Sequence, residues 1–282
     1  MMGCIAFIGL GLYGLRDISI GAIEYLRRAS RVFMEKYTSI LPDFKKEELE
    51  VIIGKKIEVL TRRNLEEESG EIIIESAKEG NVAFVSIGDP LIATTHISLM
   101  LSAIRENIKV LVFPSPSIIN GVIASTGLHI YKFSRPVTLT FIEEKYKYYP
   151  FTAYSVLEDN LRRGLHTLFL LDIRISENRI MNIKEAVNVL IELERIEKRQ
   201  IIDEELTIGI GIARSTAPDE CVYVDILRKL KKFDFGPPPY TLVIPGLLHR
   251  TEIEALNILG KADKEKLLRW NQRIKSSFLG RI

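Results

Sequence analysis

The chain has 282 residues, a length that fits two domains or one large domain. Hydrophobic residues make up 46% of it and charged residues 27%, which is ordinary for a globular protein. The formal net charge is only +2, so no overall basic field indicates nucleic acid as a required partner. With two cysteines, the chain has neither a disulfide framework nor a cysteine-rich zinc site, and we expect no metal.

The start of the chain and its longest uncharged stretch bear on where the protein works. The sequence enters a strand-like run at residues 4–8 without a basic leader, so we expect no signal peptide. Residues 110–131 are uncharged and long enough for a bilayer, but Pro114, Pro116 and Asn120 interrupt them. We therefore expect a strand, loop and helix at 110–131, no membrane partner, and a cytoplasmic protein.

Short apolar runs alternate with helical patterns in the first part of the chain. Predicted strands lie at residues 4–8, 31–35, 82–87 and 109–113, and predicted helices at 18–29, 67–79 and 96–106. Strands separated by helices indicate a parallel sheet with helices on its faces. A further helix is expected at 118–126, with Ser117 as its cap.

The pattern changes after Tyr131. Predicted strands lie at residues 137–141, 167–172, 207–213, 222–224 and 240–244, with a long amphipathic helix at 183–196. An aromatic loop is predicted, as a docking surface, a lid or a dimer contact; it comprises Tyr146, Tyr148, Tyr149, Phe151 and Tyr154. The sequence thus predicts an α/β protein with a parallel-sheet domain at 1–114 and a mixed-sheet domain at 115–282.

The first glycine loop resembles a nicotinamide-binding fingerprint. Its glycines, which spell G-x-G-x-x-G after a strand, are Gly9, Gly11 and Gly14. Glu35 ends the next strand, where a dinucleotide fold places its ribose-binding acid. However, Asp17 and Ser19 mark a helix start after the third glycine, whereas that motif needs the helix to begin at the second. A nicotinamide-dependent oxidoreductase therefore remains an alternative hypothesis.

Two further polar loops follow strands. The run from Gly88 to His96 places Asp89 at the carboxyl tip of a strand, where open α/β sheets bind ligands. Taken alone, Asp89 could instead cap a turn before Pro90. The loop 114–117 ends the next strand. One small ligand lying across the three strand ends would touch all three loops.

Together these runs resemble the diphthine synthases. In the first part of the chain the matching runs are Gly9-Leu10-Gly11-Leu12, Asp17-Ile18-Ser19, Glu35-Lys36-Tyr37-Thr38-Ser39 and Gly88 through His96. The later runs are Ser117-Ile118, Thr126-Gly127-Leu128, Tyr131-Lys132-Phe133, Gly164-Leu165-His166-Thr167, Leu171-Asp172 and Pro245-Gly246-Leu247-Leu248-His249. The resemblance covers nearly the whole chain in order.

The resemblance implies a tetrapyrrole-methylase-like fold, with S-adenosyl-L-methionine in a cleft between two α/β domains and S-adenosyl-L-homocysteine as product. It implies a homodimer and an N-methyltransferase of diphthamide biosynthesis. The implied substrate is the amino group of the 2-(3-amino-3-carboxypropyl)histidine of translation elongation factor 2, which becomes diphthine. A related methylase acting on a corrinoid or porphyrin precursor is a further alternative.

Carried over by position, the resemblance also implies a set of cofactor contacts. They are Leu12, Asp89, Ile92, Ser117, Ile118, Leu171, Ala213, Ser215 and Tyr240. The position of Tyr240 is commonly histidine in that family. We assign no catalytic base, because desolvation beside a cationic cofactor lowers the pKa of the attacking amine. Packing or loop roles are expected for the histidines His96, His129, His166 and His249.

The last segment, 257–282, has seven basic and two acidic residues, although the whole chain is almost neutral. A basic helical tail carrying Trp270 could dock a ribosome-associated substrate or nucleic acid. The alternative is a solvated terminal helix with Trp270 packed inward. We favour the second interpretation.

Overall fold

A computed structural model describes residues 3–36, 39–41 and 43–279. Tyr37 and Thr38, which are part of the family resemblance, and Arg281 of the basic tail lie outside the described residues. Contacts divide the chain into two compact units, Met1–Gly121 and Val122–Ile282. The division falls inside helix α5 (Ile118–Thr126), whereas the domain boundary was predicted before that helix.

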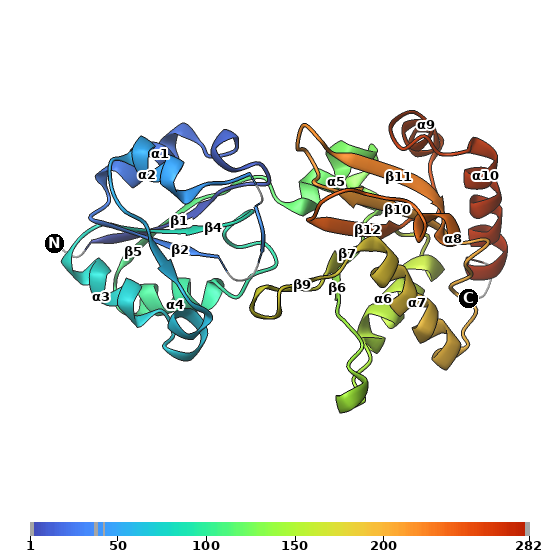
Figure 1. Cartoon of the computed structure of the whole chain (residues 1–282), viewed down its shortest axis with the longest axis horizontal. Helices are drawn as coiled ribbons and strands as arrows, with labels where there is room; N and C mark the ends of the chain where they lie inside the picture. Colours follow the sequence, from blue (N-terminus) through green and yellow to red (C-terminus); the bar gives the residue numbers. More distant parts are fainter. Residues whose placement is uncertain (1–2, 37–38, 42, 280–282) are drawn as a thin grey trace. The chain divides into compact units, whose positions relative to one another are not determined.

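The described part of the first unit contains a five-stranded parallel sheet in the order β3-β2-β4-β1-β5 (Figure 1). Its strands are β1 (Cys4–Gly9), β2 (Arg31–Glu35), β3 (Glu58–Leu60), β4 (Val82–Ser86) and β5 (Lys109–Phe113). Its helices are α1 (Ile20–Arg28), α2 (Lys46–Ile53), α3 (Glu71–Glu79) and α4 (Ile97–Arg105). The predicted parallel sheet is confirmed, and β3 and α2 were not predicted.

The central strands are apolar on both faces because helices cover both (Figure 1). Ala6 and Ile8 of β1 pack with α1 and α2 in one core, and Ile5 and Phe7 pack with α3 and α4 in the other. Helix α1 begins after Ser19, whose Oγ accepts the backbone N–H of Ala22 at 3.2 Å. The predicted helix start at Ser19 is therefore confirmed. Because the strands are parallel, their carboxyl ends and the loops that follow them share one edge.

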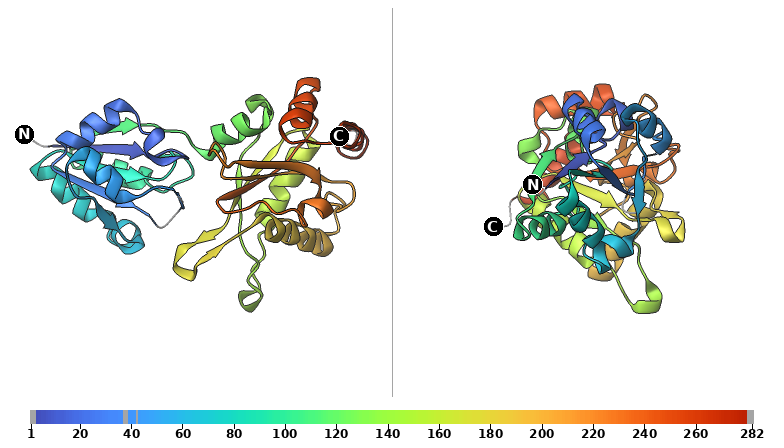
Figure 2. Two further views of the ribbon diagram at one scale, coloured as in Figure 1. Left: turned by 45° about the horizontal axis from the view of Figure 1, so that its top comes forward. Right: turned by 90° about the vertical axis from the view of Figure 1, so that its left-hand side faces the viewer.

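In the second unit, the described residues form a five-stranded mixed sheet in the order β11-β10-β12-β7-β6 (Figure 2). Its strands are β6 (Val137–Leu139), β7 (Thr167–Leu171), β10 (Ile208–Ala213), β11 (Cys221–Ile226) and β12 (Tyr240–Ile244). Only β6 and β7 pair in parallel among these described strands. A separate hairpin consists of β8 (Ile173–Arg174) and β9 (Arg179–Ile180). The predicted mixed sheet is confirmed.

The helices of the second unit, after α5, are α6 (Phe151–Arg162), α7 (Ile183–Glu197), α8 (Leu227–Leu230), α9 (Arg250–Leu259) and α10 (Lys264–Arg273). No helix in the described ranges combines the length and the apolar character needed to cross a bilayer. Among the same residues, no group of three or more His, Cys, Asp or Glu side chains is placed to hold a metal ion.

The predicted aromatic loop is partly wrong. Phe151 and Tyr154 lie in α6, and Tyr154 is fully buried with its hydroxyl donating to Glu194 at 2.8 Å. Helical spacing explains the difference, because Tyr154 and Leu157 share the buried face of α6. Tyr146 ends a short 3-10 helix and is exposed, as are Tyr148 and Phe151, so burial removes only Tyr154 from the predicted surface.

Trp270 packs inward, as the second interpretation of the basic tail predicts. Its side chain is 1% exposed, and its Nε1 donates to the Pro245 carbonyl at 2.9 Å. Asn271, the next residue, exchanges two hydrogen bonds with the backbone of Leu248. Helix α10 is therefore part of the core of the second unit.

Candidate functional site

The loops after β1 and β4 are joined directly at the carboxyl edge of the first sheet. Gly11 N–H donates to the Gly88 carbonyl at 3.1 Å, and Gly88 N–H donates to the Gly11 carbonyl at 3.0 Å. A Cβ at Gly9 would lie 2.4 Å from the Gly88 oxygen and 2.6 Å from Ser115 Cβ, so this position requires glycine. A Cβ at Gly88 would meet nothing within 4 Å, so Gly88 borders open space.

Asp89 ties the second loop to the third. Its carboxylate is 7% exposed and accepts the Leu91 N–H at 2.9 Å on one oxygen and the Ser115 N–H at 3.1 Å on the other. Ser115 in turn donates its hydroxyl to the Asp17 carbonyl at 3.1 Å. The bond to Leu91 confirms that Asp89 caps the turn. The bond to Ser115 shows that it also joins two strand ends, so all three predicted loops meet at one edge.

The first glycine loop is packed around Asp17 and does not offer a dinucleotide site. Asp17 Oδ2 accepts the Leu12 and Tyr13 N–H groups at 2.8 and 2.7 Å. In a dinucleotide fold the glycine-loop amides and the adjoining helix N-terminus would bind the pyrophosphate. Here α1 begins only at Ile20, well after the glycines. The nicotinamide hypothesis is therefore not favoured.

The remaining cofactor residues predicted in the first unit lie on these loops or just after them. Leu12 is half-buried in the first loop, and Ile92 in the second is 40% exposed. Ser117 is buried, and its N–H donates to Asn120 Oδ1 at 2.7 Å. Ile118 is half-buried at the start of α5. The edge thus combines apolar side chains with backbone polar groups.

The predicted cofactor residues of the second unit gather at one end of its sheet. Leu171 ends β7, Ala213 ends β10 and Tyr240 begins β12. Ala213 pairs with Tyr240 in the antiparallel register, and Thr241 pairs with Leu170. Burial raises the pKa of Tyr240, whose hydroxyl donates to the Gly236 carbonyl. Ser215 follows in the turn between β10 and β11.

A buried ion network in the second unit was not predicted. Its centre is Glu252, which is fully buried and accepts hydrogen bonds from His166 Nε2 at 2.9 Å, Lys132 Nζ at 3.1 Å and the His249 N–H at 2.6 Å. The His129 N–H also donates to it, at 2.9 Å. Glu252 stands at the third position of α9 and forms a capping box with His249. A glutamate three residues after a helix cap was the signal in the sequence.

The network changes the ionisation of its members. Burial by itself would raise the pKa of Glu252, but the hydrogen bonds from His166 and His249 outweigh it and lower the pKa to about 2. Burial lowers the pKa of His166 despite its carboxylate partner. His166 Nδ1 accepts the Gly246 N–H at 2.9 Å, so the neutral ring carries its hydrogen on Nε2 toward Glu252.

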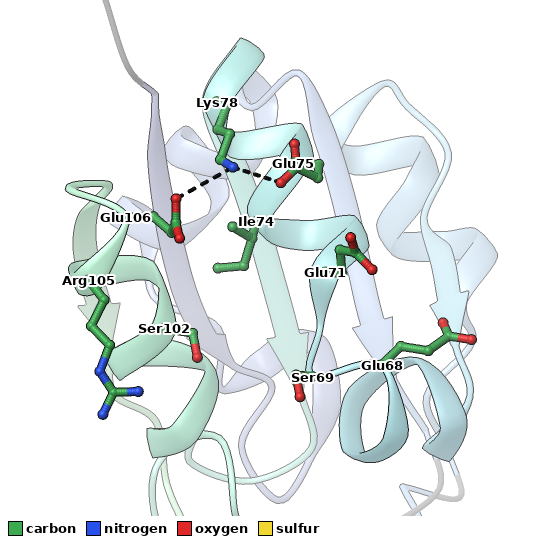
Figure 3. Close-up of a pocket in the computed structure, with 9 residues that line it drawn as sticks. All are labelled: Glu68, Ser69, Glu71, Ile74, Glu75, Lys78, Ser102, Arg105 and Glu106. Atoms are coloured by element: carbon green, nitrogen blue, oxygen red, sulfur yellow. Dashed lines mark hydrogen bonds and ion pairs between the residues drawn. The ribbon is translucent and has the colours of Figure 1, made fainter.

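A hollow of about 430 Å³ opens between α3 and α4 of the first unit (Figure 3). Lys78 crosses it and pairs with Glu75 at 2.7 Å and with Glu106 at 3.5 Å. The other lining residues are Glu68, Ser69, Glu71, Ile74, Ser102 and Arg105. None of the predicted cofactor residues lines it, so the hollow is separate from the candidate site.

The chain belongs to the family described as Tetrapyrrole (Corrin/Porphyrin) Methylases, whose model matches residues 4–230. Within that family it is similar to the diphthine synthases. The diphthine synthase of Methanocaldococcus jannaschii is 40% identical over 253 residues, which cover 89% of this chain and 96% of that protein. The diphthine synthase of Methanococcus vannielii is 36% identical over 251 residues, with the same two coverages.

A solved structure agrees with these sequence likenesses. A crystal structure of diphthine synthase matches with a TM-score of 0.84 and 33% identity, covering 96% of this chain and 99% of that one. The predicted tetrapyrrole-methylase-like fold, with a parallel and a mixed sheet, is thereby confirmed, as is the family resemblance.

Proposed function

We propose that the chain methylates the amino group of the 2-(3-amino-3-carboxypropyl)histidine of translation elongation factor 2, with S-adenosyl-L-methionine as methyl donor. The main support for this proposal is the 40% identity to a diphthine synthase across 89% of the chain. On that likeness the chain is a methyltransferase of diphthamide biosynthesis. The oxidoreductase alternative lacks its phosphate-binding amides, because Asp17 binds those of Leu12 and Tyr13.

The carboxyl edge of the first sheet fits an S-adenosyl group, which joins an apolar body to hydrogen-bonding ends. Each Asp89 oxygen accepts one backbone N–H and has a second lone pair for a ligand donor. Ile92 exposes apolar surface, and open space borders Gly88. We propose Leu12, Asp89 and Ile92 as contacts at this edge. The further proposed contacts are Ser117, Ile118, Leu171, Ala213, Ser215 and Tyr240.

We propose that these residues align the substrate amine with the methyl group of the cofactor and exclude water from the reacting groups. S-adenosyl-L-methionine, when bound, supplies a methyl group on a positively charged sulfur. Orientation alone is worth about 7–11 kcal/mol in favourable cases. Side chains that surround the substrate amine keep it unprotonated, since desolvation disfavours the charged ammonium. No residue is therefore assigned as a general base.

The partners follow from the same proposal. A protein that modifies an elongation factor works where translation occurs, so we propose a cytoplasmic enzyme. We also propose a homodimer, which the family resemblance implies. Light scattering of the purified protein tests the second point, and a mass of 32.1 kDa would contradict it.

Label transfer tests the reaction. The protein is incubated with methyl-labelled S-adenosyl-L-methionine and elongation factor 2 that carries the unmethylated side chain. Label is expected in the elongation factor and not in precorrin or porphyrin substrates offered in parallel. Titration calorimetry is expected to show binding of S-adenosyl-L-homocysteine and none of NAD. The reverse result would overturn the proposal.

A further inference from the structure

Helix α4 has apolar side chains on its outer face as well as on its inner one. Leu99 and Ala103 of the inner face are buried in a core of the first sheet. The outer positions of the neighbouring helix α3 are mostly charged, as is usual for a surface helix, whereas no residue of α4 from 97 to 104 is charged. Three outward side chains, which we call the α4 stripe, are 46%, 44% and 50% exposed: Ile97, Leu101 and Ile104. A helix that is apolar on both sides is typical of one that is covered on both sides.

The α4 stripe lies beside the free edge of the first sheet. Strand β5 ends the order of the described strands, and α4 lies on the sheet face opposite α1 and α2 (Figure 1). Val112 of β5 is in register with Phe7, which belongs to the core under α4, so Val112 shares that face, and it is 39% exposed. Ser102 and Arg105, each one residue after a member of the stripe, line the hollow toward α3, so the stripe faces away from α3. Exposed apolar surface beside a free sheet edge is typical of a surface that binds another protein chain.

The spacing of the α4 stripe suits contact with itself. Ile97 lies four residues before Leu101 and Ile104 lies three residues after it, so the stripe is nearly symmetrical about Leu101. When two copies of α4 pack antiparallel across a two-fold axis at Leu101, the two Leu101 side chains meet and each Ile97 meets Ile104 of the second copy. Because the stripe has no charged residue, this contact brings no like charges together at its centre. A surface that is complementary to itself favours a second copy over an unrelated partner.

We infer that a second copy of this chain docks on the α4 stripe, with the two α4 helices antiparallel across a two-fold axis at Leu101. The inference rests on the proposed function, because the homodimer is part of that proposal, and it names the surface through which the homodimer forms. Association removes the three stripe residues of each copy from water, which is the driving force for the contact. Val112 lies beside the stripe in each copy and extends the apolar surface.

Light scattering over a range of protein concentrations tests the inference with charged variants of Leu101. The native protein is expected to have the mass of two 32.1 kDa chains. Leu101→Glu and Leu101→Arg each place two like charges at the two-fold axis, so each variant is expected to have the mass of one chain. We expect the dissociation constant of the dimer to rise at least about a hundredfold. Because Leu101 is partly exposed in the single chain, the circular dichroism spectrum is expected to stay native.

A matched control comes from another exposed helical isoleucine. Ile258 of α9 is 67% exposed, and Ile258→Glu is expected to keep the mass of two chains. Should Leu101→Glu and Leu101→Arg fail to fold, Ile104→Glu takes their place and is expected to have the mass of one chain.

Two further experiments test the antiparallel arrangement. Mixing Leu101→Glu with Leu101→Arg is expected to restore the mass of two chains, because opposite charges then meet at the axis. The double variant Ile97→Glu with Ile104→Arg brings opposite charges together twice, so it is expected to form more dimer than either single variant. Failure of both combinations to restore the dimer would overturn the proposed arrangement.

The outcomes distinguish the inference from the function on which it rests. If the native protein has the mass of two chains and folded Leu101→Glu has the same mass, the inference is overturned and the homodimer stands. A native mass of one chain at every concentration overturns both the inference and the homodimer. If the masses are as expected but no label reaches elongation factor 2, the proposed reaction is overturned and the inference stands.

Discussion

The carboxyl edge of the first sheet and the Glu252 network of the second unit consist of different kinds of chemical group. The edge contains glycines, backbone polar groups and the carboxylates of Asp17 and Asp89, and its groups come from loops that follow strands. The network joins ionisable side chains that are far apart in sequence, Lys132, His166 and Glu252. The edge retains hydrogen-bonding capacity for a ligand, whereas the network uses its capacity within the protein.

This difference separates binding from stability. Removing one partner of a buried ion network leaves an uncompensated charge, so its cost falls on folding. A substitution at the carboxyl edge moves the backbone of loops that face a ligand. We therefore expect it to weaken ligand binding more than it destabilises the fold. The following predictions would break or sharpen this contrast, beginning with the largest effect.

Glu252→Gln is expected to lower the free energy of unfolding by about 3–5 kcal/mol, because Lys132 and His166 lose their buried carboxylate partner. Urea denaturation followed by circular dichroism measures the change. Glu254→Gln, on the exposed side of the same helix, is the control and is expected to stay within about 0.5 kcal/mol of native. Equal losses in both variants would contradict the role given to the network.

Acid is expected to destabilise the second unit through the same residues. The pKa of Glu252 is about 2 in the folded state and 4.5 ordinarily, so its contribution is complete above about pH 4.5 and is lost as the pH falls toward 2. Within that window the loss approaches about 1.4 kcal/mol per pH unit. His166, whose pKa burial lowers, adds a loss below its ordinary value of 6.5, because only the unfolded state takes up the proton there.

Urea denaturation of the native protein and of Glu252→Gln at pH 7, 5 and 3.5 measures this dependence. The stability of the native protein is expected to fall more steeply between pH 5 and 3.5 than that of the variant. Parallel pH profiles would show that Glu252 does not carry the acid sensitivity.

Gly9→Ala is expected to separate the loops at the carboxyl edge, since its Cβ would lie 2.4 Å from the Gly88 oxygen. Overpacking of this kind typically costs about 1–3 kcal/mol of stability, and we expect a loss of S-adenosyl-L-homocysteine affinity of at least tenfold. Gly21→Ala in α1, whose Cβ would meet Phe113 at an ordinary 3.4 Å, is the control. Native affinity in Gly9→Ala would argue against a ligand at this edge.

Asp89→Ala is expected to have the smallest effect on folding and a clear one on binding. The two loops lose the hydrogen bonds to Leu91 and Ser115, while the sheet and both cores are untouched. We expect S-adenosyl-L-homocysteine to bind about tenfold more weakly, as measured by calorimetry. Asp159→Ala, an exposed residue of α6, is the control. Unchanged affinity in Asp89→Ala would refute its proposed role.

The elements that sequence patterns predicted to the residue are those with strong local signals. Strands β2, β5 and β12 and helix α5 have the predicted bounds. The unpredicted β3 (Glu58–Leu60) has three residues, two of them exposed, so its sequence lacks a buried pattern. Aromatic residues near Pro150 favoured a loop where α6 begins, although the buried positions of α6 follow helical spacing. The structure of β3 and the start of α6 therefore depends on tertiary packing more than on local sequence.

The candidate site likewise has features that the sequence could predict and features that it could not. The meeting of the three loops followed from parallel strand order, so sequence could predict it. The contact between Ser125 and Ser215 and the contact between Lys132 and Glu252 join residues about 90 and 120 positions apart, which no local pattern reveals. Asp89 belongs to both groups, because the turn that it caps was predicted and its hydrogen bond to Ser115 was not.

The contact between Trp270 and Pro245 has a consequence for how the chain matures on the ribosome. Met1–Gly121 has its own sheet and its own cores, so it is expected to fold while later residues are still being synthesised. The second unit cannot complete its packing until α10 has emerged, because Trp270 and Asn271 hold the loop leading to Glu252. Until then its central strands lack part of their cover, and this interval is when a nascent chain would most need chaperone protection.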